Sequence, residues 1–138
     1  MSEEELKELS ENIRKNIIGL LELWSSKEEQ LEYQKNVPIA QVSAELFCQW
    51  DDFYHPETKA HKLAFSEIET KIIDFFYKKI ESVSTKKNPD DWFPYIDEFI
   101  LTKDWIELNK LAKITLKNLN SKNNLIKSLK NYLCRLKN

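Results

Sequence analysis

Glycine is almost absent from this chain: Gly19 is the only one among 138 residues. Phosphate-binding loops, tight β-turns and β-bulges rely on glycine because it tolerates positive φ and the close approach of another group to the backbone. Its scarcity therefore argues against Rossmann and P-loop nucleotide sites and against most β folds. The sequence predicts an all-α protein.

Cysteine and long apolar runs are also scarce. Cys48 and Cys134 are the only cysteines, and they lack the CxxC spacing of metal and redox sites. No apolar run approaches the roughly 18 residues that cross a bilayer, and residues 1–5 are acidic where a secretory signal is basic. We therefore expect a cytoplasmic protein without a membrane partner, in which both thiols are reduced and buried.

Acidic residues are missing from one part of the chain. Residues 108–138 carry eight cations and no Asp or Glu, whereas residues 1–107 carry 23 acids and 13 cations. Such a basic segment can bind nucleic acid, or it can pair with the acidic body of the same chain. Because only one of the eight cations is an arginine, the side chain that reads bases best, the sequence favours pairing within the chain.

Apolar residues at helical spacing are abundant. The length and the 41% apolar content suit one soluble domain, residues 1–138. Separate blocks repeat an apolar residue every three or four positions, and a serine followed three residues later by glutamate marks several block starts. We predict an irregular bundle of six or seven helices, with residues 89–119 forming two or three of them. The expected helices begin near Ser2, Ser26, Ser43, Ser66, Thr102 and Ser121.

The least ordinary segment is residues 46–56, which holds four aromatic side chains and two adjacent carboxylates within eleven residues. On a helix, Leu46, Phe47 and Trp50 fall on one face, which we expect to be buried with Phe53 or Tyr54. The acidic residues then lie outside. Neighbouring helical positions point about 100° apart, so the adjacent Asp51 and Asp52 do not form a simple catalytic pair.

Other catalytic arrangements fit the sequence poorly. His55 and His61 are six residues apart around Pro56, in a segment that reads as a polar loop, and lack the spacing of converging metal ligands. Cys48 and His55 would lie about two helical turns, or 10 Å, apart, which is too far for a hydrogen bond. Asp90 and Asp91 are expected to cap a helix. We predict no catalytic residue, no metal and no cofactor, since an enzyme would need side chains that converge only in the fold.

Four stretches of residues 32–77 stand out together: EYQ at 32–34, VP at 37–38, ELFCQWDDFY at 45–54 and FSEIE at 65–69. In this segment the chain resembles small bacterial immunity proteins of the contact-dependent-inhibition and polymorphic-toxin type. The resemblance implies a cytoplasmic protein that binds a cognate toxin domain and blocks its active site or its access to substrate.

The residues themselves also favour a protein-binding function. Exposed acids beside aromatic rings complement a basic partner and give fast, specific association. We expect a protein partner, most concretely a basic toxin domain, on the outer side of the helix at 43–53 and the loop after it. The predicted contact residues are Gln49, Asp51, Asp52, Tyr54, His55 and Glu57. The alternative is a nucleic-acid-associated or regulatory protein that acts through its basic C-terminal helices.

Overall fold

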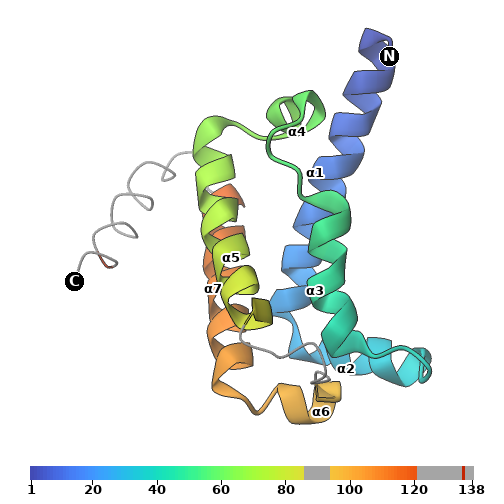
Figure 1. Ribbon diagram of the computed structural model, residues 1–138, viewed down its shortest axis with the longest axis vertical. Coiled ribbons are helices and arrows are strands. Elements are labelled where there is room, and N and C mark those ends of the chain that lie inside the picture. Colours follow the sequence, from blue (N-terminus) through green and yellow to red (C-terminus); the bar gives the residue numbers. More distant parts are fainter. Residues whose placement is uncertain (86–93, 121–134, 136–138) are drawn as a thin grey trace.

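Seven helices form the computed structural model, which describes residues 1–85, 94–120 and 135 (Figure 1). They are α1 (Glu3–Ser25), α2 (Lys27–Asn36), α3 (Val42–Phe53), α4 (Lys59–Ala64), α5 (Glu67–Thr85), α6 (Ile96–Phe99) and α7 (Lys103–Asn120). No strand occurs in these residues, and the predicted all-α bundle is confirmed. None of the described helices is long and apolar enough to cross a membrane.

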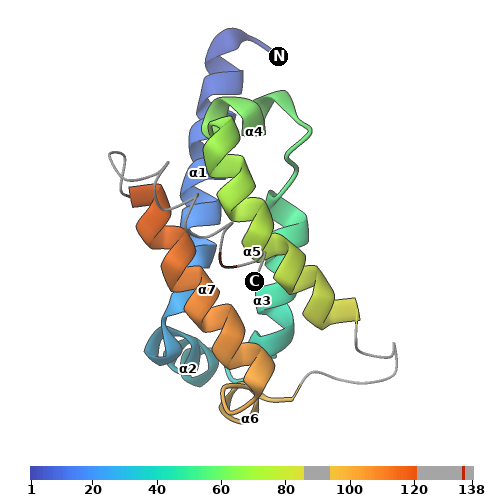
Figure 2. The same cartoon turned by 90° about the vertical axis from the view of Figure 1, so that its left-hand side faces the viewer.

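The long helices lie side by side, and the short ones close the two ends. Helix α1 packs against α3 on one side and α7 on another, and α5 packs against α7 (Figures 1 and 2). Helix α4 lies against α1 at one end of the long axis, whereas α2 and α6 contact each other at the opposite end. The molecule therefore presents two different ends to a partner.

Local capping explains where most helices begin. The side-chain oxygens of Ser2, Ser26 and Thr102 each accept a hydrogen bond from the backbone N–H three residues on, at 3.1, 3.2 and 3.2 Å. At α5 the bond is reciprocal: Glu69 N donates to Ser66 Oγ at 3.1 Å, and Ser66 N donates to Glu69 Oε1 at 3.0 Å. These caps satisfy N–H groups that a helix start leaves unpaired, and the four predicted starts are confirmed.

Two local predictions were wrong. Ser43 does not cap α3, which begins at Val42, because the Ser43 side chain is fully buried and its Oγ donates to the carbonyl oxygen of Pro94 at 2.6 Å. The expected polar loop contains the six-residue helix α4, which is capped by Thr58. A short helix with one visible cap and few apolar residues leaves little periodicity to detect.

Some predictions lie outside the described residues. These are the caps at Asp90 and Asp91, the position of Cys134 and the last helix after Ser121. In the described part of residues 89–119 there are two helices, α6 and α7.

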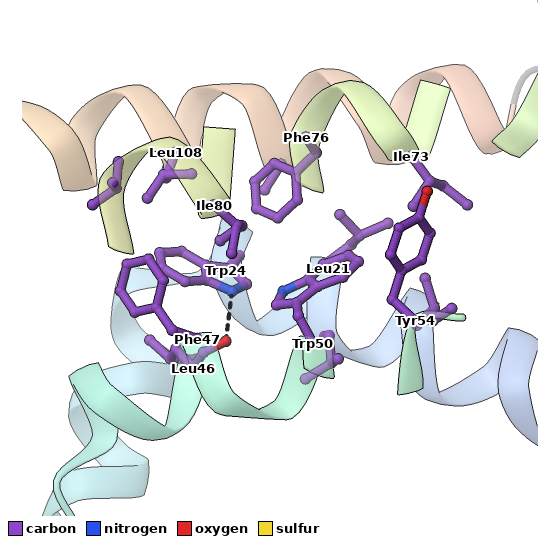
Figure 3. Close-up of a cluster of buried hydrophobic side chains, with 14 of the residues drawn as sticks. Leu21, Trp24, Leu46, Phe47, Trp50, Tyr54, Ile73, Phe76, Ile80 and Leu108 are labelled. Atoms are coloured by element: carbon purple, nitrogen blue, oxygen red, sulfur yellow. Dashed lines mark hydrogen bonds between the residues drawn. The ribbon is translucent and has the colours of Figure 1, made fainter. Parts of the chain in front are cut away.

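Aromatic rings dominate the core, as Figure 3 shows. Trp24, Trp50 and Phe76 are completely buried. The Trp24 ring meets Phe47 edge-on at 5.2 Å between centroids, and the Trp50 ring lies 5.3 Å from Phe76. The inward face predicted for α3, with Leu46, Phe47 and Trp50, is confirmed.

One buried amide connects three helices where α1 stops. Gln30 is fully buried, and its Nε2 donates to the carbonyl oxygens of Leu23 and Trp24 at 2.9 and 3.2 Å. Trp105 Nε1 donates to Gln30 Oε1 at 2.9 Å, and Asn109 Nδ2 donates to the Trp24 carbonyl at 2.8 Å. The carbonyls left unpaired at the end of a helix are thus satisfied without water.

Replacing Gln30 by alanine should destabilise the protein by about 2 to 4 kcal/mol, because the change leaves a cavity and buried polar groups without partners. Urea unfolding followed by circular dichroism measures this loss. The matched control is Glu32→Ala, an exposed position on the same helix, which should change the free energy of unfolding by no more than about 0.5 kcal/mol. Equal effects of both changes would contradict a structural role for the amide.

Candidate functional site

The predicted contact residues lie at the carboxyl end of α3 and in the connection to α4. Asp51, Asp52, His55 and Glu57 are exposed, and we call these four residues the acidic surface. Gln49 is half-buried behind them.

Tyr54 does not belong to this surface, contrary to prediction. Its side chain is 5% exposed, and its hydroxyl donates to Asp74 Oδ1 at 2.9 Å. The ring lies 5.9 Å from that of Trp50 and 4.5 Å from that of Tyr77. Burial, followed by the hydrogen bond to Asp74, raises the pKa of Tyr54. The residue is therefore a neutral anchor that fixes the start of the loop against α5.

Cys48 also differs from the expectation, because its side chain is exposed rather than buried. It follows Phe47 on α3, and the helix turns it away from the core that Phe47 and Trp50 enter. Phe47 and Trp50, and not Cys48, are the side chains by which this part of α3 fills the core.

The two adjacent carboxylates face different neighbours, as helical geometry predicts. Burial raises the pKa of Tyr77 on α5, and the charges of Glu81, Asp51 and Asp74 raise it further, which places Asp51 on the α5 side. Asp52 instead borders a groove against α1. The pair thus spreads negative charge over two sides of the α3 end.

This groove has a volume of about 380 Å³ and lies between α1 and the connection from α3 to α4. Leu9 and Ile13 of α1 form one wall, and Phe53 lies opposite them beside Asp52 and His55. Leu9 is 39% exposed. Leu9 therefore offers apolar surface at the edge of the groove.

Arg14 holds α1 next to α4 and α5 below the groove. Its guanidinium donates to Glu69 at 2.9 and 3.2 Å and to the carbonyl oxygen of Ala64 at 2.8 Å, and it lies 5.0 Å from the centre of the Phe65 ring. Burial alone would raise the pKa of Glu69, but hydrogen bonds from Arg14 and Ser66 lower it. The ion pair thus joins α1 to α5, and the bond to the Ala64 carbonyl joins α1 to the end of α4.

The acidic surface keeps its charge available. Within the described residues, no ion pair joins Asp51, Asp52 or Glu57 to a cation. Other carboxylates are engaged, since Asp74 pairs with Lys78 at 3.3 Å and Glu107 with Lys79 at 2.6 Å. Unpaired carboxylates beside apolar groups are arranged to meet a cation from outside.

His61, expected in a polar loop, is instead a buried residue of α4. Its side chain is 1% exposed, its Nε2 lies 3.1 Å from Thr70 Oγ1, and its ring contacts those of Tyr54 and Phe65. Burial lowers the pKa of His61, although the charge of Glu57 opposes this and that of His55 adds to it. In the described part of the chain, no three His, Cys, Asp or Glu residues are grouped to hold a metal.

The buried imidazole makes stability depend on pH. The unfolded chain takes up a proton at His61 below pH of about 6.5, but the folded protein resists it, so stability is lost as the pH falls through that value. We expect the stability advantage of the protein over His61→Gln to shrink between about pH 8 and pH 5 in urea titrations. A stability difference between the protein and His61→Gln that does not vary with pH would contradict the effect of burial.

Comparisons with known protein families, curated proteins and solved structures give no match for this chain. The resemblance of residues 32–77 to immunity proteins thus remains a prediction. The function of the chain is inferred from the geometry and charge of the acidic surface and the groove beside it.

Proposed function

We propose that this protein binds a cationic protein through the acidic surface and the adjoining groove, and that the partner is a bacterial toxin domain that it neutralises. One observation carries the proposal: Asp52, which has no ion-pair partner among the described residues, stands at the edge of an apolar groove formed by Leu9, Ile13 and Phe53. The surface combines charge and apolar area at one place.

The two parts have different roles in binding. The carboxylates attract and orient a basic surface, which raises the association rate and rejects acidic partners. The groove provides apolar area that loses water when a partner side chain enters it, and this burial supplies affinity. A lysine or arginine beside an exposed apolar residue is the matching feature on the partner.

Neutralisation by this surface needs no catalytic residue in the chain. A bound protein that occupies the active site or the substrate path of the toxin is sufficient, and a rigid surface binds with less loss of entropy than a loose one. Tyr54 and Arg14 supply this rigidity, since they fix the loop to α5 and α1 to α4.

Reversing both charges, with Asp51→Lys and Asp52→Lys, should weaken binding of a basic toxin domain that the protein recognises. Because steering is lost, the association rate at low salt should fall by roughly tenfold or more. Surface plasmon resonance at several salt concentrations measures it, and the variant should lose most of the salt dependence that the protein shows.

The control for this experiment is Glu22→Lys with Glu32→Lys, which changes the net charge equally at exposed positions of α1 and α2. It should retain most of the association rate. Circular dichroism melting should be unchanged in both variants because all four positions are exposed. Normal folding with undiminished binding by the Asp51 and Asp52 variant would refute this position for the interface.

A second candidate function rests on α7, where Lys110, Lys113 and Lys117 are exposed on successive turns. A stripe of lysines can bind phosphates without reading sequence. Retention of the chain on DNA or RNA columns at low salt, lost when the three lysines are changed to glutamate, would favour this alternative. If the acidic surface is the functional one, we expect no retention even at low salt.

A further inference from the structure

Exposed apolar side chains gather at the end of the molecule opposite α4. Among the described residues eight large apolar side chains are exposed; two of them follow α2, two flank α6 and one lies near the start of α7. These five are Val37, Ile39, Tyr95, Leu101 and Ile106. Figure 1 shows α2 and α6 together at this end, far from α4 along the long axis. Apolar clusters of this kind mark interaction sites.

A groove of about 470 Å³ lies at this end between α2 and α6. Its apolar lining comes from Leu31 and Pro38 on the α2 side and from Tyr95 on the α6 side. The charges are divided between the walls: Lys35 lies on α2, and Asp97 and Glu98 lie on α6. No ion pair within the described residues engages any of these three.

We propose that two copies of this chain associate through the groove around a two-fold axis. A symmetric dimer needs a surface that is complementary to itself, because each residue that contacts the partner is contacted in return. A groove with a cation on one wall and acids on the other meets this condition. Rotation by half a turn brings Lys35 of each copy to Asp97 and Glu98 of the other.

Ile39 supplies the apolar contact in this arrangement. Its side chain is 96% exposed at the tip of the turn between α2 and α3, beside Pro38 of the groove. Gln34 braces the turn, since its Nε2 donates to the carbonyl oxygen of Ala40 and its Oε1 accepts from Val42 N at 3.2 Å. Burial of Ile39 in the groove of a second copy removes apolar surface from water and so stabilises the dimer. Because the turn is already braced, it loses little conformational entropy on binding.

The dimer does not depend on the proposed function. The acidic surface lies at the carboxyl end of α3 and in the connection to α4, whereas the groove lies between α2 and α6, so the acidic surface stays free when α2 and α6 are covered. A dimer would carry two acidic surfaces that face away from the contact.

Sedimentation velocity on the full chain at about 1 to 100 µM tests the proposal, because a dimer fraction rises with concentration by mass action. We expect a dimer that Ile39→Asp converts to a monomer, and the two proteins should melt alike at concentrations below the dimer Kd. Lys35→Glu alone, or Asp97→Lys with Glu98→Lys, should raise the dimer Kd by roughly tenfold or more, since like charges then face each other.

The three changes together should restore the dimer, because opposite charges meet again with their signs exchanged. Leu63→Asp is the control: Leu63 is 62% exposed on α4, and its change should leave the Kd unaltered. A protein that stays monomeric at every concentration would overturn the proposal, and the groove would then be a site for another protein. A dimer Kd that Ile39→Asp does not change would overturn it as well. So would a failure of the combined charge exchange to restore the dimer.

Discussion

The buried side chain of Gln30 is the contact on which the arrangement of helices depends. In the last turn of α1, Trp24 is fully buried and Leu23 is half-buried, and the carbonyls at a helix end are costly to bury unless something donates to them. Gln30 donates to two of them and accepts from Trp105, so one amide fixes the turn from α1 to α2 and the position of α7. Asn109 of α7 donates to the Trp24 carbonyl as well.

The position of the acidic surface follows from this junction. Trp24, whose carbonyl Gln30 binds, donates its indole N–H to the Leu46 carbonyl at 3.3 Å and so places α3 along α1 (Figure 3). With Phe47 and Trp50 held inside, Asp51 and Asp52 must lie outside. The same packing that stabilises the core therefore orients the charges.

Most of the fold was predictable because its signals are local. Capping serines and apolar spacing within a few residues predicted the starts at Ser2, Ser26 and Ser66. The exposure of Asp51 and Asp52 was predictable for the same reason, since helical geometry alone separates the two faces of α3. The choice of Tyr54 over Phe53 for the buried face was not predictable, because the Tyr54 hydroxyl binds Asp74, 20 residues later. The groove was not predictable either, because one of its walls comes from Leu9, more than 40 residues earlier in the chain.

The sequence by itself determined the all-α class, most helix boundaries and which face of α3 is apolar, because these depend on neighbours within one or two turns. Only the tertiary structure decided that Ser43 binds Pro94 instead of capping a helix and that His61 is buried in a short helix. It also placed the apolar turn at Ile39 beside the charged walls of a groove, at the end opposite the acidic surface. Such contacts join residues far apart in the chain, and no local pattern encodes them.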